Sequence, residues 1–207
     1  MALNTYAALQ TAIGSWLNRE DLTSQIPDFI TLAEARFNRE LRTSQMEARI
    51  SASVTGASYA LPADWLETIN FSYLGASGYE QPLLYIDPAQ YGMQASVTLD
   101  GAARYFTQIG TSYYILPPPT TATTFYLTYR QKIPALSGSN TTNWLLARSP
   151  DLYLYGALLM AEPYLQNDER VPLWAAAVQK TIADMNLESD RARAPRGHLT
   201  TSRRTFG

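Results

Sequence analysis

The sequence contains no cysteine and a single histidine, His198. The absence of cysteine excludes disulfides, zinc sites with thiolate ligands, iron–sulfur clusters and cysteine nucleophiles. One histidine, placed close to the last residue, does not supply the imidazole held in a cleft that a catalytic triad requires. The glycine-rich motifs GxxxxGKS/T and GxGxxG, which hold phosphates, are also missing. We therefore expect no catalytic residues, no metal site and no cofactor.

Charged residues are scarce: they make up 16% of the 207 residues, against roughly 25% in a typical soluble domain. Aromatic residues are abundant instead, with 14 Tyr and 4 Trp. Surfaces that are poor in charge and rich in tyrosine are usually covered by a partner. The composition therefore predicts a protein that works by association.

No secretory signal and no membrane span are expected. The opening stretch MALNTYAALQTAIG has no Lys or Arg ahead of its apolar residues. The longest uncharged run, residues 105–129, is interrupted by Pro117–Pro119, whereas a span needs about 20 mostly apolar residues. We expect a soluble protein that is made in a cytoplasm.

The formal charge of −2 is unevenly distributed. Residues 191–207 hold five arginines and no acid, so the rest of the chain has 16 − 5 = 11 basic against 18 acidic residues, a net charge of −7. This basic segment also contains Pro195, two glycines and only two large apolar residues, so it cannot form a core by itself. It is either a solvated terminus or an arm that becomes ordered on a partner.

Two helical pairs enclose a β-rich block. The first pair has apolar stripes on residues 6–17 and 26–41, with Glu34, Asn38, Arg39 and Arg42 expected on the polar side of the second helix. Short alternating segments fill residues 46–132, including a hairpin with its turn at Gly110 and a small helix at 87–94. Helices return after Ser149-Pro150-Asp151 and at residues 169–190.

This order predicts an α+β fold rather than alternating βαβ units. We expect a helical hairpin at residues 1–45, an inserted antiparallel β block at 46–142, a second helical pair at 143–190 and an extended basic arm at 191–207. The two helical pairs are expected to pack together as one four-helix unit, because neither pair alone makes a core.

Paired carboxylates are the one catalytic chemistry that the composition allows. Asp64 with Glu67, and Glu162 with Asp168 and Glu169, have suitable spacing, but the same spacing occurs in ordinary caps and surface pairs. Arg36, Arg39 and Arg42 are interleaved with acids, which favours a salt-bridged helix face over a phosphate site.

Tyrosines recur in the predicted strands, where successive side chains point to opposite faces. Half of these rings are therefore expected to fill a core, and the other half to remain outside as contact area for another subunit. The candidates for subunit or partner contact are Tyr105, Tyr113, Tyr114, Tyr126 and Tyr129, together with the loop glycines Gly75 and Gly78.

Several longer motifs carry a resemblance to a known family: PDFITLAEARFNRELR at 27–42, YALPADWLE at 59–67, YYILPPP at 113–119, LTYRQKIPAL at 127–136 and NWLLARSPDLYLYGALLMAEPYL at 143–165. Together they resemble the head-to-tail adaptor, or connector, proteins of short-tailed bacteriophages, and the layout is similar to that of the tail tubular A proteins. The resemblance covers almost the whole chain, and its motifs are structural.

The resemblance implies a structural virion protein without enzymatic activity. Such adaptors form a ring, commonly a dodecamer, between the portal protein and the tail nozzle, and double-stranded DNA passes through the lumen during ejection without sequence-specific binding. The β part would face the nozzle and the tail fibres. Assembly would take place in the host cytoplasm. The arm would dock on the portal through Arg191, Arg193, Arg196, Leu199, Arg203, Arg204 and Phe206.

Three other functions remain open at this stage. A carbohydrate-binding or tail-fibre-like β module would also be rich in tyrosine, but would not need two flanking helical pairs. A carboxylate-dependent cell-wall hydrolase would lose activity on Glu67→Gln or Glu162→Gln. A nucleic-acid binder acting through the arginine-rich arm would show affinity that falls steeply with salt.

Overall fold

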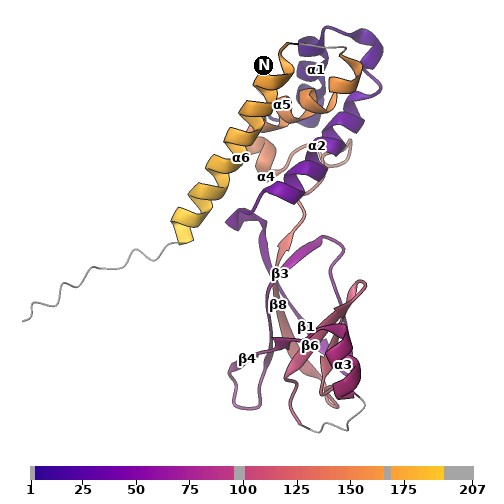
Figure 1. Cartoon of the computed structure of the whole chain (residues 1–207), viewed down its shortest axis with the longest axis vertical. Coiled ribbons are helices and arrows are strands. Elements are labelled where there is room, and N and C mark those ends of the chain that lie inside the picture. The colour runs from indigo at the N-terminus through magenta and orange to yellow at the C-terminus, as the bar shows by residue number, and fades with distance from the viewer. Residues whose placement is uncertain (1–2, 96–100, 166–168, 194–207) are drawn as a thin grey trace, which may run out of the picture. The chain divides into compact units, whose positions relative to one another are not determined.

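The computed structural model describes residues 3–95, 101–165 and 169–193 of the chain. The polypeptide divides into two compact units (Figure 1). The helical unit combines Met1–Ser44 with Ala135–Gly207, and the β unit is formed by Gln45–Pro134. Helices and sheets are thus segregated along the chain, and the predicted α+β class is confirmed. Among the described helices, none has the length and apolar character needed to cross a membrane.

The helical unit begins with α1 (Tyr6–Leu17) and α2 (Ile26–Glu40), joined through the short 3-10 turn η1 (Glu20–Leu22). Thr5 caps α1 by accepting a hydrogen bond from the Ala8 N–H at 3.2 Å, and Asn18 ends the helix in the left-handed conformation. Pro27 lies in the first turn of α2. Both helices predicted in this region are present, and their buried residues, apart from Glu34, are Leu9, Ile13, Leu17, Ile26, Phe29, Ile30, Ala33 and Phe37.

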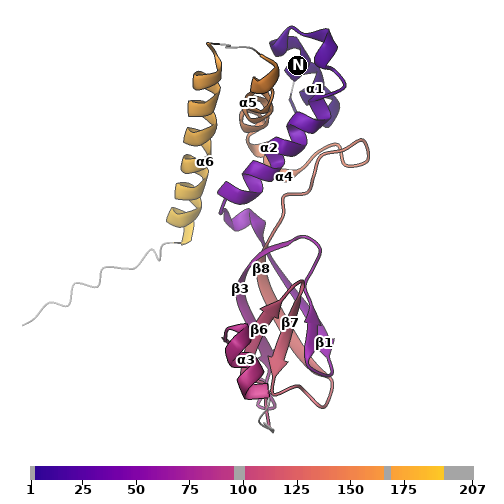
Figure 2. The same ribbon diagram turned by 45° about the vertical axis from the view of Figure 1, so that its right-hand side comes forward.

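The second half of the helical unit contains α4 (Trp144–Arg148), α5 (Pro150–Met160), η3 (Glu162–Tyr164) and α6 (Val171–Arg193). The predicted helix start at Ser149-Pro150 is confirmed. Since α5 is apolar on nearly every side, it packs against α1, α2, α4 and α6 (Figure 2). Its approach to α2 needs Gly156, because a Cβ there would lie 2.5 Å from Phe37 Cζ. The helix α5 is therefore the centre of this unit.

Two features of the helical unit differ from the prediction. The expected four-helix unit leaves out α4, a separate helix whose cap Asn143 accepts a hydrogen bond from the Leu146 N–H at 2.8 Å. The sequence predicts the end of the last helix at residue 190, whereas α6 continues through Arg193. Arg191 and Arg193 lie at the negative end of the helix dipole, which favours this extension.

The β unit contains two four-stranded sheets. The first has the strand order β1 (Glu47–Val54), β8 (Thr123–Gln131), β3 (Trp65–Leu74), β4 (Glu80–Pro82). The second has the order β2 (Ser58–Ala60), β7 (Ser112–Leu116), β6 (Tyr105–Ile109), β5 (Leu84–Tyr85). A 3-10 turn, η2 (Ser44–Met46), precedes β1. The predicted hairpin of β6 and β7 is confirmed, and its turn residue Gly110 has a φ of 62°.

One strand pairing corrects the prediction of an antiparallel block. Strands β5 and β6 pair in parallel, with Leu84 opposite Tyr105 and Tyr85 opposite Phe106. Parallel neighbours need a crossover connection, and α3 (Pro88–Ala95) lies within the connection between these strands. Asp87 caps α3, as the sequence predicts, and accepts hydrogen bonds from the N–H groups of the following turn at 2.8 and 2.9 Å.

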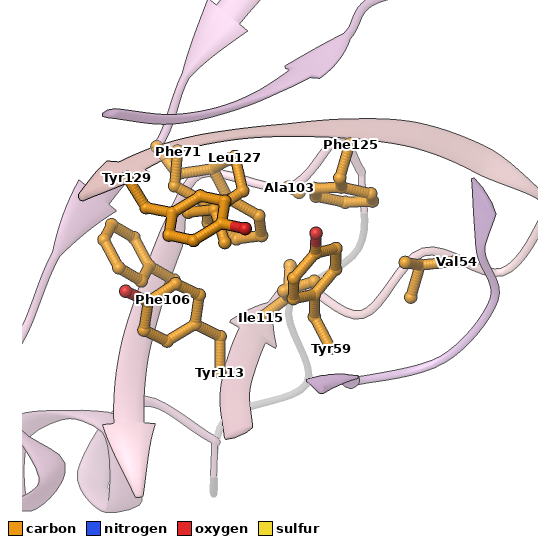
Figure 3. Packing of buried hydrophobic residues seen from close by; sticks show 11 residues of the cluster. Val54, Tyr59, Phe71, Ala103, Phe106, Tyr113, Ile115, Phe125, Leu127 and Tyr129 are labelled. Atoms are coloured by element: carbon orange, nitrogen blue, oxygen red, sulfur yellow. The ribbon is translucent and has the colours of Figure 1, made fainter. Parts of the chain in front are cut away.

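The two sheets of the β unit enclose one aromatic core (Figure 3). Phe71 on β3 and Phe125 on β8 stack with ring centroids 5.5 Å apart. Phe71 also meets Tyr113 and Phe106 of the second sheet at 5.1 and 5.2 Å. Such ring pairs add about 0.5–1.5 kcal/mol each to the burial of their area, so they hold the sheets face to face.

The chain changes sheets at both sides of this sandwich. Consecutive strands β1 and β2 form edges of different sheets, and so do β4 and β5. The Leu83 N–H donates to the Phe71 carbonyl of the first sheet at 3.0 Å, and the Leu84 N–H donates to the Arg104 carbonyl beside the second at 2.9 Å. One side of the β unit therefore presents β1 and β2, and the opposite side presents β4 and β5.

Candidate functional site

The carboxylates considered for catalysis in the β unit are engaged in structural contacts. Asp64 accepts a hydrogen bond from the Tyr129 hydroxyl at 3.1 Å, and its backbone carbonyl accepts one from the Lys132 N–H at 2.6 Å. Glu67 lies on β3 and forms an ion pair with Arg130 of β8 at 2.8 Å. These contacts tie the entry of β3 to β8, so both acids have a structural task.

The other acidic and basic candidates lie on the helical unit. Glu162 is in η3, while Asp168 and His198 lie outside the described residues. Within the described part of the chain, no cluster of three or more His, Asp or Glu could hold a metal ion. Arg36 pairs with Glu40 at 2.8 Å, one turn along α2, which agrees with a salt-bridged helix face.

The sequence pattern predicts that Glu34 lies on the exposed, polar side of α2. This prediction is wrong, because the Glu34 side chain is buried and only 5% exposed. Its Oε1 accepts hydrogen bonds from the Leu136 N–H at 2.9 Å and from the Tyr153 hydroxyl at 3.0 Å. The Asn143 side chain donates to the same hydroxyl at 2.6 Å. The position of Glu34 between Ile30 and Phe37 on the apolar stripe was the available signal.

The Glu34 network fastens the irregular segment that leads from the β unit back to the helices. Leu136 and Asn143 lie at the two ends of this segment, and both contact the network. Burial raises the pKa of Glu34, although the hydrogen bonds from Leu136 and Tyr153 oppose that shift. Burial, and then the charge of Glu34, also raises the pKa of Tyr153. Each shift favours the neutral form of its group relative to the same group in water.

The end of α6 is attached to the end of α2. The Asn186 side chain accepts from the Arg42 N–H at 2.7 Å and donates to the Glu40 carbonyl at 3.0 Å. The Ser189 hydroxyl accepts from the Ser44 N–H at 2.9 Å. These bonds satisfy backbone groups that the end of α2 leaves without a helical partner. They fix the place from which the basic segment begins.

The predicted arm is only partly within the described residues. Arg191 and Arg193 are exposed in the last turn of α6. Arg196, Leu199, Arg203, Arg204 and Phe206 lie outside the described residues. The structure therefore locates the start of the arm on a helix that is held at its base by Asn186 and Ser189.

The candidate contact tyrosines separate into two groups. Tyr113 and Tyr129 are 1% and 3% exposed, so their rings fill the core and are not surface contacts. Tyr105, Tyr114 and Tyr126 are half-buried. Because side chains along a strand alternate between its two faces, some of these tyrosines had to point into the core, but the sequence alone did not determine which of them do.

Two of the half-buried tyrosines are covered within the chain. The Arg49 guanidinium lies 4.8 Å from the Tyr126 ring centroid and continues to an ion pair with Glu80. The Tyr114 ring meets Tyr91 of α3 at 6.2 Å. The outer faces of both sheets thus carry their own internal contacts.

More exposed apolar side chains lie near β4 and β5, and the sequence pattern did not single them out. Tyr79, Leu84 and Tyr85 are 73%, 64% and 58% exposed. Tyr79 follows the loop of Gly75 and Gly78, in which the Gly75 N–H donates to the Tyr79 carbonyl at 2.9 Å. Large apolar side chains that are exposed on a sheet edge make this side of the β unit a candidate contact surface.

The acids described above are engaged in contacts within the chain, and apolar side chains are exposed at the edge formed by β4 and β5. These features are typical of a structural protein that associates with others. The family described as SU10 adaptor protein matches residues 4–202 of the chain. The chain therefore belongs to the SU10 adaptor protein family, a family of bacteriophage structural adaptors. The resemblance to phage adaptor proteins is confirmed. No protein among the curated ones matches the sequence.

Proposed function

We propose that this chain is a head-to-tail adaptor of a bacteriophage, which forms a ring between the portal protein and the tail nozzle. The observation that carries the proposal is the family match over residues 4–202, which includes both units. The proposed ring is a dodecamer in the virion tail at the portal vertex, assembled in the host cytoplasm. The adaptor has no catalytic task in this function.

The helical unit is proposed to form the ring wall, and the β unit to face the nozzle and tail fibres. Outside the basic segment, the residues of the helical unit (1–44 and 135–190) carry 7 basic and 12 acidic side chains, a net charge of 7 − 12 = −5. An acidic wall suits a channel for DNA, because phosphates are repelled and do not adhere to it. Sequence-specific contact with DNA is not part of this function.

The basic segment is proposed to dock on the portal. Its base is fixed on α6 by the hydrogen bonds of Asn186 and Ser189 to the end of α2. Arginines form strong, charge-assisted hydrogen bonds to carboxylates and carbonyls. In this proposal Arg191, Arg193, Arg196, Arg203 and Arg204 supply those contacts, and Leu199 and Phe206 supply apolar anchors.

Deletion of residues 194–207 tests the docking role, because it keeps α6 intact to Arg193. The truncated protein should keep the helical signal and unfolding transition of the full chain. It should fail to add to capsids that carry the portal encoded by the same phage, as measured by co-sedimentation and light scattering. Normal addition of the truncated protein would refute the docking role.

Substitutions separate charge from length in the same assay. Replacing Arg196, Arg203 and Arg204 by Glu should abolish addition to portal-bearing capsids, whereas replacement by Lys keeps the charge and should weaken it less. Binding to naked duplex DNA, measured at two salt concentrations, is the counter-assay. Tight binding to DNA without binding to portal would favour the nucleic-acid alternative over the adaptor.

A further inference from the structure

Strand β1 forms a long edge of its sheet. It pairs with β8 in unbroken register from Glu47 opposite Arg130 to Val54 opposite Thr123, and it is the last strand of its sheet. Its eight residues contain no proline, and no bulge interrupts the pairing. Proteins usually shorten, bend or cover such an edge, because its free N–H and C=O groups readily pair with another chain.

A groove of about 520 Å³ lies beside this edge, between β1 and β2. Its lining has no charged residue, and small side chains such as Ala52, Ser58 and Ala60 leave the space open. An uncharged groove of this kind calls for an uncharged, largely apolar occupant.

The opposite side of the β unit carries such an occupant. The extended segment 80–86 passes from the first sheet to the second, and buries Leu83 and Ile86 at 7% and 8% exposure. Leu84 and Tyr85 between them are 64% and 58% exposed. Neither of these two side chains is charged. Adjacent residues of a strand point to opposite faces, and the Tyr85 ring packs edge-on against Phe106 of the same copy at 5.5 Å, so Leu84 is the apolar side chain that this segment offers to a neighbour.

We propose that Leu84 of one copy inserts into the groove between β1 and β2 of the next copy. The inference rests on the proposed ring and names a lateral contact between neighbouring β units within it. The groove and Leu84 lie at opposite edges of the same two sheets, so one copy cannot use both with itself. A contact between two different surfaces repeats around a ring, whereas pairing of β1 with a second β1 would stop at a dimer.

The backbone contributes unequally to this contact. The Leu83 N–H points to β3, so by alternation Pro82 faces outward, where it has no N–H to donate. At Pro82 the segment therefore offers a carbonyl but no N–H to a neighbouring β1, so the backbone hydrogen bonds do not make a full ladder there. Leu84 supplies the apolar anchor, in the manner of a side chain on a strand added to a sheet edge.

Cross-linking tests the contact directly, because the chain has no cysteine of its own. Ser58→Cys in the groove and Leu84→Cys on the protruding segment are combined in one chain, assembled on portal-bearing capsids and treated with a short bismaleimide. A ladder of covalent oligomers is expected from the double variant, and no dimer from either single variant. The matched control pairs Ser58→Cys with Met93→Cys, since Met93 on α3 is similarly exposed at 67%.

Each outcome is decisive. Assembled rings in which the double variant does not cross-link, or in which the Met93 control cross-links equally, refute the lateral contact and leave the proposed function standing. Dimers from Ser58→Cys alone would show pairing of like edges and refute it too. If no ring forms with the unmodified chain, the proposed function fails, and this inference fails with it.

A charge placed on the anchor supplies a second readout. Leu84→Asp should fold normally, because the side chain is exposed, but should reduce ring formation at least tenfold. Met93→Asp places the same charge at a similarly exposed site and should leave ring formation unchanged. Equal assembly of the two variants would contradict the contact.

Discussion

The Tyr153 hydroxyl donates a hydrogen bond to Glu34 Oε1 at 3.0 Å, across 119 residues of sequence and inside an apolar interior. The pair joins α2 to α5, while Leu136 and Asn143 bring the connecting segment to the same point. A single carboxylate thus holds the two helices and the returning chain together. The helical unit of the adaptor is therefore stabilised by a buried hydrogen-bond network as well as by its apolar core.

Loss of the Glu34 carboxylate should destabilise the helical unit. Glu34→Ala leaves the Leu136 N–H and the Tyr153 hydroxyl without their acceptor, which we expect to cost about 3 kcal/mol of unfolding free energy. Glu34→Gln keeps an acceptor oxygen and should cost about 1 kcal/mol or less at neutral pH. Urea unfolding of the three proteins measures both values, and equal stability of Glu34→Ala and the native chain would contradict this role.

The same residue predicts a pH dependence. Because burial raises the pKa of Glu34 above its ordinary 4.5, the folded chain keeps this proton in a pH range where the unfolded chain has released it. The contribution of Glu34 is thus largest below pH 4.5 and is lost as pH rises through the folded pKa. Glu34→Gln should remove that part of the stability profile. Parallel profiles of the two proteins would show that the carboxyl titrates normally.

Replacing a helical glycine by alanine has two effects on stability: it raises helix propensity, and it adds a methyl group that can clash. Comparing Gly156→Ala on α5 with a control on α1 should distinguish the two effects. In Gly156→Ala the new Cβ would approach Phe37 Cζ to 2.5 Å, and overpacking of this kind costs about 1–3 kcal/mol. Gly14→Ala on α1 is the matched control, since its Cβ would meet Ile26 Cδ1 at 3.5 Å. That variant should gain about 0.5–1 kcal/mol from propensity. Thermal unfolding should therefore show shifts of opposite sign.

Tyr129 should govern stability in alkaline solution. Burial, followed by the hydrogen bond to Asp64, raises the pKa of Tyr129 from 10.0 to about 12. The folded chain therefore keeps the phenol proton between these values while the unfolded chain loses it, so this contribution falls as pH rises from 10 to 12. Tyr129→Phe should cost about 1 kcal/mol at neutral pH and flatten the alkaline decline. Tyr126→Phe, on the outer face, should keep the decline.

Removal of the Asn186 side chain should loosen the base of the basic segment. Asn186→Ala leaves the Arg42 N–H and the Glu40 carbonyl without their partner, an expected loss of about 1–2 kcal/mol. Hydrogen exchange should accelerate at the end of α2 and in the last turns of α6, while exchange in the β unit stays unchanged. Uniform exchange across the chain would contradict a local attachment.

Features with a strong local cause could be predicted from the sequence. The α1–α2 hairpin follows from its caps and apolar stripes, the β6–β7 hairpin from its turn at Gly110, and the start of α5 from Ser149-Pro150. Each of these signals lies within a few neighbouring residues, so no knowledge of the distant chain is needed.

Features set by distant residues could not be predicted. Glu34 is buried because Leu136 and Tyr153, more than a hundred residues away, supply its hydrogen bonds. The inward orientation of Tyr113 and Tyr129 depends on which sheet faces lie against each other, and the parallel pairing of β5 depends on the path of the chain through α3. Charge asymmetry indicated the basic segment, but the extension of α6 depends on how its end is held.

The division of the helical unit between two stretches of sequence has a consequence for biosynthesis. During translation, residues 45–134 emerge as a complete β unit while α5 and α6 have not yet been made. Until then α1 and α2 display apolar side chains such as Ile30 and Phe37 that α5 will later cover. The nascent chain therefore passes through a stage in which its β unit can already fold while α1 and α2 still expose apolar side chains that chaperones bind.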